Sequence, residues 1–535
     1  HWAMAQHETV KTADAFASSQ RILEERVRLS RSLIWRMQRD FYGNRALKAW
    51  TEDLVPSYIT NNPLIAEIYA GMIIAFLEDC LAKSSPHPSR ENPLRILELG
   101  AGTGKFAYLL LRKLAALLRM RNIPLKVLRY VMTEFSENLV AEWRSNPYLG
   151  QFVGEGLLEF AVFEADQESS HGSSARLASN VRGPLVVIAN YVFDSLPQDA
   201  FTVDHGQIDE LLVTTSSQAT AQDLQNLRFS FAKSRILSTD YPDAVWNNIM
   251  EQYRTRLPAA TVLLPTTTLK TLKGLSEASN GTMLVLAADK GVGHEEDLGL
   301  LQGDPTLDFH ASKRCFSQLV NFDAIAKYFQ NRGGEALLPR KHFTSLNLCA
   351  FIDHPPEEDF PATRNAYQQT ADAFGPDDLF AIMSWLNDHL EQTPLAQAVS
   401  LLRLTRWDPT AFLRLFPVIA RQARSAGPER NDLHDAILSV WENHYPLSKQ
   451  ENILPFYCGV VLLELRFFSE AYEMFRKSQR LFEPSAATSY NLGLCCLGMD
   501  RPGEALDFMR EACRLDPNLE PARQSRLKLE SQFSQ

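Results

Sequence analysis

The feature that most constrains the fold is an apolar run that leads into a glycine-rich turn and then into a helical stretch. Residues 94–99 read LRILEL, residues 100–104 read GAGTG, and residues 105–120 have the apolar spacing of an amphipathic helix. Glycines at such a turn allow a tight bend and let a ligand approach the backbone closely. The G-x-G-x-G spacing differs from the G-x-G-x-x-G spacing that cradles a dinucleotide pyrophosphate. The unit therefore predicts a ligand-binding turn of another kind.

Apolar runs and helical stretches continue to alternate after this turn. The later runs are VLRYVMTEF, LLEFAVFEAD, PLVVIANYVF, TMLVLAADKG and LNLCAFI, and the stretch VNFDAIAKYFQNRGG between the last two is helical in pattern. This alternation is typical of a parallel, doubly wound sheet, which binds ligands at the carboxyl ends of its strands. We expect a Rossmann-like α/β domain at residues 91–353. Residues 204–280, which mix a hairpin (FTVDHGQIDELLVTT) with helical segments, are interpreted as an insertion on the substrate side.

The length of the chain requires more than one domain. Its 535 residues exceed a single hydrophobic core, because cores stop growing at about 250–300 residues. Residues 5–90 carry helical periodicity and are predicted to form a helical N-terminal cap. Residues 354–377 are rich in proline and acidic residues and are predicted to be a linker. Residues 378–535 are predicted to form an all-α domain.

A pattern within this helical stretch recurs at an offset of 34 residues. The matched pairs are Phe456/Tyr490, Gly459/Gly493, Glu470/Glu504, Ala471/Ala505, Phe475/Met509, Arg480/Arg514 and Leu481/Leu515. This offset is the tetratricopeptide period, in which small residues let paired helices approach closely and aromatic residues fill the gap between repeats. The pattern predicts a tetratricopeptide-like domain whose concave surface holds a protein substrate or partner.

Composition excludes several classes of partner. The formal net charge of −10 argues against a surface adapted to nucleic acid. The seven cysteines include no C-x-x-C pair, so reduced thiols and no metal site are expected. The longest apolar stretch, residues 63–82, is interrupted by acidic residues, and the first residues lack the layout of a secretory signal. We expect a cytoplasmic protein with no membrane partner, and a homodimer remains open.

The glycine turn, together with the acidic residue that precedes it, resembles motif I of the class I methyltransferases. The resemblance implies that the turn holds the methionine part and ribose of S-adenosylmethionine through Glu98, Gly100, Ala101, Gly102, Thr103 and Gly104. A nucleoside also needs a carboxylate at the end of the second strand, and Glu134 in VMTEFS occupies that place. Phe135 beside it and Asp166 after the third strand are the further cofactor candidates, Asp166 for the adenine amine.

Polar residues follow the fourth strand of the predicted sheet. Asn190, Tyr191 and Asp194 stand where that strand ends, in VVIANYVFDSLP, and this edge would lie beside the reactive methyl group. We take these three as the catalytic candidates, and Asn190 also as a cofactor contact.

Several motifs in the same order give a narrower resemblance. LELGAGTGKFA, TEFSENLVAEW, VVIANYVFDSLPQDAF, LAADKG and VNFDAIAKYF, preceded by SYITNNPLIAEIYA, make residues 35 to 350 similar to the MidA family of methyltransferases. That family includes the mitochondrial arginine methyltransferase needed for respiratory complex I assembly. The resemblance implies that Thr60, in the segment that folds over the cofactor, lies on the cofactor side.

Two departures from the family pattern lie near the substrate side. Tyr191 replaces a glutamate, and the family's aspartate-tyrosine-glycine reads here as Asp289-Lys290-Gly291. A guanidinium acceptor needs carboxylates to orient it. The loss of one therefore weakens arginine as the target and leaves an amide, amine or carboxylate acceptor, held by Asn190 and Tyr191, as an option.

Three functions remain open from the sequence. The first is a protein methyltransferase whose repeat domain recruits the substrate. The second is a methyltransferase of a small-molecule or carrier-bound substrate, and the third is a non-catalytic assembly factor that keeps the fold. The intact glycine turn opposes the third, because a scaffold would not need it.

Overall fold

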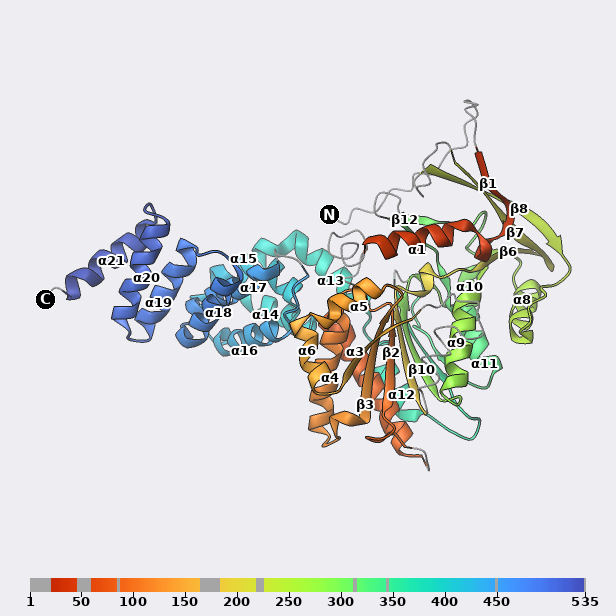
Figure 1. The fold of residues 1–535 in the computed structure, drawn as a ribbon, viewed down its shortest axis with the longest axis horizontal. Helices are drawn as coiled ribbons and strands as arrows, with labels where there is room; N and C mark the ends of the chain where they lie inside the picture. The colour runs from red at the N-terminus through yellow and green to blue at the C-terminus, as the bar shows by residue number, and fades with distance from the viewer. Residues whose placement is uncertain are drawn as a thin grey trace.

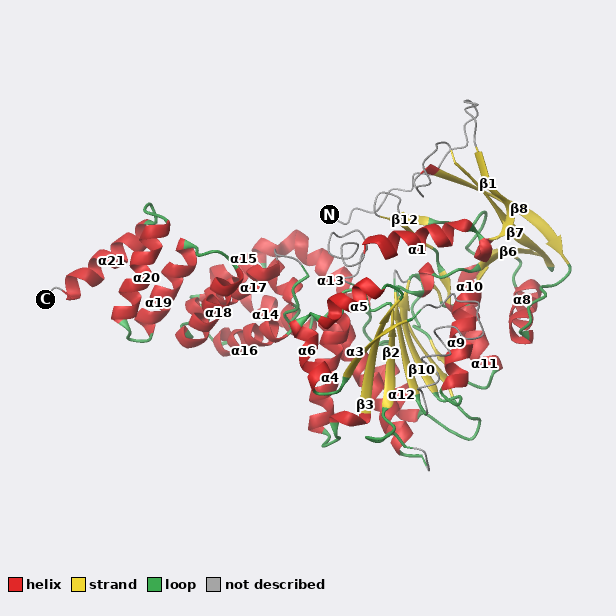
Figure 2. Cartoon of the chain, viewed as in Figure 1, coloured by secondary structure: helices red, strands yellow, loops and turns green. Residues whose placement is uncertain are grey.

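The computed structural model describes residues 21–45, 59–83, 87–163, 183–217, 226–310, 315–342, 346–447 and 451–533. A unit built around a central sheet occupies one end of the molecule. A row of helices extends from it and carries the C-terminus at its far end (Figures 1 and 2).

The central sheet has seven strands. They are β2 (Leu94–Leu99), β3 (Leu128–Glu134), β4 (Leu158–Val162), β5 (Leu185–Asn190), β10 (Met283–Asp289), β15 (Glu335–Leu337) and β16 (Asn347–Asp353). Their order is β15-β16-β10-β5-β2-β3-β4. The strands from β4 to β10 are parallel, whereas β16 runs antiparallel to both of its neighbours. The sheet is therefore mixed, because β16 runs opposite to all the other strands.

Helices cover both faces of this sheet, which explains why its central strands β5 and β10 are almost continuously apolar. Successive residues of a strand point to opposite faces, so Ile96 and Leu97 enter different cores. On the face of Ile96 lie α3 (Pro63–Leu81), α4 (Lys105–Met120), α5 (Glu137–Arg144) and α6 (Pro147–Gly154). On the face of Leu97 lie α8 (Ala244–Arg256), α9 (Thr266–Ala278) and α11 (Phe322–Asn331).

A second, antiparallel sheet comes mostly from the segment that we expected to be an insertion. Its strands are β1 (Arg21–Arg28), β6 (Asp199–Asp204), β7 (Gln207–Ser217), β8 (Leu227–Ile236) and β9 (Ala259–Leu264). The predicted hairpin is confirmed, since β6 pairs with β7 around a two-residue turn at His205 and Gly206.

The prediction of a helical cap at residues 5–90 is wrong in part. The helices α1 (Leu33–Arg45) and α3 are present, but β1 pairs antiparallel with β7. The segment RILEERVR has no clean strand alternation, and β7 supplies the hydrogen bonds that make it a strand.

The prediction of a linker at residues 354–377 is also wrong in part, because a packed helix, α12 (Pro361–Gln369), lies within it. The buried Asp79 carboxylate accepts hydrogen bonds from the backbone N–H groups of Ala362 at 3.2 Å and Thr363 at 2.8 Å. The Tyr367 hydroxyl donates to the carbonyl of Leu348 at 2.9 Å. These contacts fix α12 against α3 and the sheet, so the segment does not act as a free spacer.

The C-terminal region is helical throughout its described residues. Its α-helices are α13 (Pro376–His389), α14 (Leu395–Leu404), α15 (Pro409–Ala423), α16 (Glu429–Glu442), α17 (Leu454–Glu464), α18 (Phe468–Leu481), α19 (Ala486–Gly498), α20 (Pro502–Leu515) and α21 (Glu520–Phe533). One hydrophobic cluster runs without a break from Ile96 in the sheet to Cys495 in α19. The helical region and the sheet therefore share a core.

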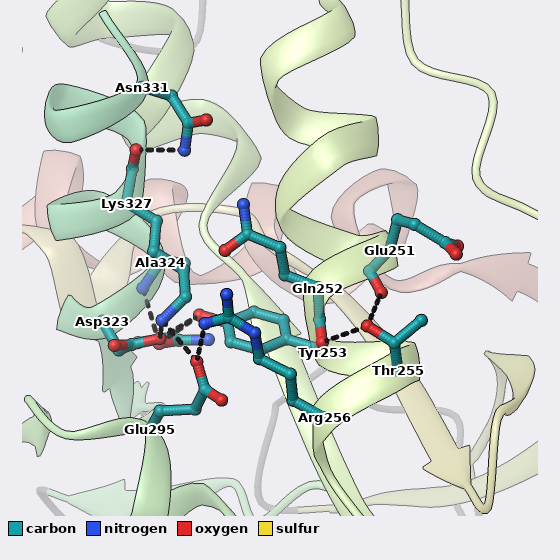
Figure 3. Close-up of polar contacts among 11 residues, drawn as sticks. Glu251, Gln252, Tyr253, Thr255, Arg256, Glu295, Asp323, Ala324, Lys327 and Asn331 are labelled. Atoms are coloured by element: carbon teal, nitrogen blue, oxygen red, sulfur yellow. Dashed lines mark hydrogen bonds and ion pairs between the residues drawn. The ribbon is translucent and has the colours of Figure 1, made fainter. Parts of the chain in front are cut away.

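A network of buried charges holds α8, α11 and the short helix α10 (Glu295–Leu298) together (Figure 3). The Lys327 ammonium group lies 2.8 Å from the Glu295 carboxylate and also bonds to Asp323. The Tyr253 hydroxyl donates to Oδ2 of Asp323 at 2.7 Å. Each buried charge thus has an opposite charge and hydrogen bonds, which is the condition under which burial of ions is tolerated.

Candidate active site

The ends of four parallel strands meet at one edge of the central sheet. The glycine turn follows β2, and the last residues of β3, β5 and β10 are Glu134, Asn190 and Asp289. Because neighbouring parallel strands end at the same edge, these polar side chains gather beside the turn.

The turn is built from backbone conformations that favour glycine. Gly100, Gly102 and Gly104 have φ values of 62°, 54° and 78°. A Cβ on Gly100 would lie 3.1 Å from a methyl carbon of Val192, and a Cβ on Gly104 would lie 2.9 Å from the terminal methyl of Met132. Side chains at these positions would therefore be strained and would crowd the space over the turn.

Hydrogen bonds fix the turn on several sides. Ala101 donates its backbone N–H to the carbonyl of Thr133 at 3.0 Å. The indole N–H of Trp143, on α5, donates to the carbonyl of Gly102 at 2.9 Å. The hydroxyl of Tyr445, from the helical region, donates to the carbonyl of Thr103 at 2.8 Å. Three contacts from outside the turn thus hold its backbone in place.

Glu134 faces this turn from the end of β3. Its side chain is buried, and its carboxylate accepts hydrogen bonds from the backbone N–H of Phe135, at 3.1 Å, and of Gly102. Burial raises the pKa of Glu134 to about 7, and the two backbone donors oppose this rise. Near neutral pH the group can therefore ionise to accept hydrogen bonds from a ligand.

Glu98 lies behind the turn and is also buried. Its Oε2 accepts a 3.0 Å hydrogen bond from the Tyr130 hydroxyl. Burial raises the pKa of Glu98 to about 8, the Tyr130 hydrogen bond lowers it, and the nearby Glu134 raises it further. Two carboxyl groups thus lie close together under the glycine turn.

Asn190 is the last residue of β5, and only one of the two polar atoms of its side chain has a hydrogen-bond partner among the described residues. Its Oδ1 accepts a 2.7 Å hydrogen bond from the hydroxyl of Tyr69 on α3. Within the described part of the chain, its buried Nδ2 has no hydrogen-bond partner. A buried donor without a partner costs free energy, so this amide is a candidate for ligand contact.

Tyr191 adopts the left-handed backbone region, with φ of 52°. This conformation is rare for residues other than glycine, and such strain collects at functional sites. The phenol is half-buried; burial, Asp289 and then Asp194 raise its pKa well above the ordinary value. Tyr191 therefore presents a neutral hydroxyl.

Asp194 and Asp289 form a buried acidic pair. The Asp194 backbone N–H donates to Oδ2 of Asp289 at 3.0 Å, and Lys290 donates its N–H to Oδ1 of Asp289 at 2.9 Å. The Ser195 hydroxyl donates to Asp194 at 2.8 Å. Burial raises the pKa of Asp194 to about 6 and that of Asp289 well above its ordinary value. One carboxyl of the pair thus keeps a proton under mildly acidic conditions.

The structure brings most of the sequence candidates together. Around one edge lie Glu98, the turn from Gly100 to Gly104, Glu134, Phe135, Asn190, Tyr191 and Asp194. Thr60 is buried in the turn just before α3, and its cofactor role stays a prediction. Asp166 lies outside the described residues. The individual roles of all these residues remain predictions.

Sequence reasoning missed the aromatic residues that support the site. Tyr69, Tyr130, Trp143 and Tyr445 each donate a hydrogen bond to a residue of the site. The spacing of Tyr69 and Trp143 on helical stretches gave no signal beyond core packing. Asp289 had a signal, since it ends an apolar strand as Asn190 does.

Two kinds of feature are absent from the described residues. No group of three or more His, Cys, Asp or Glu side chains there could hold a metal ion. In the same part of the chain, every helix is too short or too polar to cross a membrane.

Comparison with family models gives a match to one part of the chain. Residues 76–328, just under half of the chain, match the model of a family described as "Putative S-adenosyl-L-methionine-dependent methyltransferase". No curated protein matches the chain.

Solved structures give low similarity. An uncharacterized protein from Burkholderia thailandensis is 16% identical with a TM-score of 0.39, over 63% of this chain and 89% of that chain. A superfamily member from the same organism, bound to S-adenosyl-homocysteine, is 16% identical with a TM-score of 0.37, over 61% and 87%. Magnesium protoporphyrin IX methyltransferase from Synechocystis PCC 6803 is 11% identical with a TM-score of 0.25, over 59% and 98%. On the family match, the chain is a methyltransferase that uses S-adenosyl-L-methionine as its cofactor.

Proposed function

We propose that the chain transfers a methyl group from S-adenosylmethionine to a side chain of a protein that the C-terminal helical region recruits. The observation that carries the placement of the cofactor is the contact of Glu134 with the glycine turn. A carboxylate there suits the two ribose hydroxyls, and the glycine backbone leaves room for the rest of the ligand. The unpaired Nδ2 of Asn190 offers a further donor at the same edge.

The cofactor supplies a methyl group bound to a positively charged sulfur, and transfer is a displacement in line with that bond. The protein must align the acceptor and exclude water. An acceptor amine must also lose a proton before it can attack. Asp194, whose pKa is raised to about 6 by burial, is suited to accept that proton near neutral pH.

The finer resemblance to the MidA family supports the domain but not an arginine acceptor. The family's glutamate is replaced by Tyr191, whose raised pKa keeps it neutral. A neutral phenol cannot pair with a guanidinium as a carboxylate does. We therefore favour an amine or amide side chain as the acceptor.

The geometry of the C-terminal helices supports the prediction of a tetratricopeptide-like domain. A Cβ on Gly459 would lie 2.9 Å from the ring of Phe475, and a Cβ on the equivalent Gly493 would lie 2.7 Å from Met509. The same close approach of paired helices thus recurs after 34 residues. The helices α18 and α20 also begin and end 34 residues apart. Such stacked pairs form extended surfaces that hold peptide segments.

A small-molecule acceptor is the second candidate. A pocket of about 320 Å³ is lined by Ile208, Ser238, Thr239, Asn247, Asn248, Met250, Glu251 and Arg254, which all belong to the expected insertion. None of these lining residues is at the strand ends described above, so this pocket gives weaker support than the helical region.

The test is incubation of a cell lysate with the full chain and S-adenosylmethionine carrying a labelled methyl group. We expect label in one or a few proteins, absent when Glu134→Ala replaces the native chain. Label only in the small-molecule fraction would overturn the protein acceptor in favour of the second candidate. An inert chain that still binds the cofactor would favour an assembly factor.

A further inference from the structure

A tyrosine from the helical region touches the backbone of the glycine turn. Tyr445 follows α16, lies 342 residues from Thr103 in sequence, and donates its hydroxyl to the Thr103 carbonyl at 2.8 Å. The Tyr445 side chain is buried, at 3% exposure. A Cβ on Gly104 would lie 3.2 Å from the same hydroxyl, so the phenol is also in packing contact with the turn.

The Tyr445 hydroxyl has no freedom to reorient. It accepts a 2.8 Å hydrogen bond from Nδ2 of Asn146 while it donates to Thr103. Asn146 is itself fixed, because its Oδ1 caps α6 by accepting from the N–H of Tyr148 at 2.9 Å. Burial raises the pKa of Tyr445 well above the ordinary value, so the hydroxyl keeps its proton. A hydrogen bond from a neutral, fully engaged hydroxyl holds its direction.

The surroundings of this hydroxyl are aromatic and buried. The Tyr445 ring lies 5.2 Å from the ring of Tyr108 on α4 and 5.3 Å from that of Tyr148 on α6. The neighbouring His444 is buried, and burial lowers its pKa to about 4, with Lys105 lowering it further. His444 is therefore neutral near pH 7 and brings no charge to the turn.

A second set of contacts attaches the helical region to α4 without touching the turn. The Tyr108 hydroxyl donates to the carbonyl of Glu442 at 3.2 Å. Arg112 pairs with the Glu442 carboxylate at 3.0 Å. These contacts dock the two regions, whereas Tyr445 alone among these docking groups reaches the turn itself.

We propose that Tyr445 is a positioning residue that sets the backbone of the glycine turn, which makes the helical region part of the cofactor site. This inference rests on the proposed function, because it requires the turn to hold S-adenosylmethionine. A positioning contact of this kind couples the two regions. A movement of the segment around Tyr445 changes the affinity of the turn for the cofactor, and cofactor binding in turn favours one position of that segment.

The experiment compares Tyr445→Phe with Tyr108→Phe in the full chain. Each variant loses one hydroxyl at the same junction, but only the first loses a bond to the turn. Calorimetric titration with S-adenosylhomocysteine is expected to give a Kd raised about fivefold or more for Tyr445→Phe, and a native Kd for Tyr108→Phe. Thermal unfolding of both variants shows that each is folded at the titration temperature.

A second variant and a spectroscopic readout separate positioning from general stability. Asn146→Ser keeps a good helix cap but is too short to reach Tyr445, so it is expected to raise the Kd in the same direction. The ¹⁹F resonance of fluorinated Trp143, which bonds to Gly102, is expected to shift in Tyr445→Phe and to stay native in Tyr108→Phe.

The outcomes are distinguishable. A native Kd and a native Trp143 resonance in Tyr445→Phe would overturn the positioning role, even if that variant melts at a lower temperature. Equal weakening by Tyr108→Phe would also overturn it, because docking alone would then explain the effect. Absence of binding by the native chain would instead refute the cofactor site on which the inference rests.

Discussion

The backbone N–H of Asp194 donates a 3.0 Å hydrogen bond to the carboxylate of Asp289, although 95 positions separate the two residues. The bond joins the segment after β5 to the end of the neighbouring strand β10. It brings two carboxyl groups into one buried place, where burial raises the pKa of both. The pair therefore retains a proton at a pH where isolated carboxyl groups would be ionised.

This pair predicts a dependence of stability on pH. The folded-state pKa of Asp194, about 6, lies above the ordinary value of 3.8. The folded state therefore binds more protons than the unfolded state. The stabilisation that this proton contributes is fully present below about pH 4 and is lost as the pH rises through about 6. Between pH 4 and pH 7 the free energy of unfolding should fall for the native chain and should fall by about 1–3 kcal/mol less for Asp194→Asn. Urea unfolding at both pH values measures this difference.

The control for the acidic pair is Asp507→Asn, since the Asp507 side chain is 81% exposed in the helical region. It should keep the native loss of stability over the same pH interval. An equal loss of stability between pH 4 and pH 7 in Asp194→Asn and in the native chain would show that the acidic pair does not cause the dependence of stability on pH.

Replacement of a glycine of the turn should destabilise the fold. Gly104 has φ of 78°, and a Cβ there would lie 2.9 Å from Met132. Gly104→Ala should cost about 1–2 kcal/mol for the left-handed backbone alone. In contrast, Gly71→Ala, in the middle of α3 with no atom near its Cβ, should gain about 0.5–1 kcal/mol. Denaturant midpoints that change in the same direction for both variants would contradict this view.

The two repeat glycines should respond differently to the same substitution. At Gly459 a Cβ would meet the rigid ring of Phe475 at 2.9 Å, whereas at Gly493 it would meet the flexible end of Met509 at 2.7 Å. Gly459→Ala should therefore destabilise by about 1–3 kcal/mol from overpacking. Gly493→Ala should be close to neutral, because helix propensity offsets a small shift of Met509. Chemical unfolding of the pair tests the difference, and the reverse order would refute it.

The buried charge network should be intolerant of a broken pair. Lys327 is held between Glu295 and Asp323, and its side chain is 10% exposed. Lys327→Met leaves the buried Asp323 carboxylate without its cation, while Glu295 keeps Arg256 at 3.5 Å, and should cost about 3–5 kcal/mol. The control, Lys341→Met, breaks an exposed pair with Asp378 and should cost about 1 kcal/mol at most. A small effect at Lys327 would mean that water reaches the network.

Local pattern predicted much of the fold. The apolar runs became β2, β3, β4, β5, β10 and β16, because strands covered by helices on both faces must be largely apolar. Residues Arg21–Arg28 gave no such signal, since β1 is a strand only through its pairing with β7. The helix α12 was hidden because Pro361 begins the helix rather than a spacer, and because the carboxylate that docks it comes from Asp79 on α3, far away in sequence.

The candidate site was predictable only where its residues follow strands. Glu134, Asn190 and the glycine turn could be placed, because the carboxyl ends of parallel strands share an edge. Tyr445 could not, since its contact with Thr103 depends on how the helical region docks, 342 residues away. Contacts of that range follow from shared packing, which no local spacing encodes.

The most direct test of the account is calorimetric titration of the full chain with S-adenosylmethionine, beside Glu134→Ala and the control Glu142→Ala at an exposed position of α5. The account predicts saturable binding by the native chain, native binding by Glu142→Ala, and a Kd raised about tenfold or more by Glu134→Ala, through loss of a charged acceptor. Equal affinities for the native chain and Glu134→Ala would contradict the placement of the cofactor at the glycine turn. No binding by the native chain would contradict the conclusion that it is a methyltransferase that uses S-adenosylmethionine.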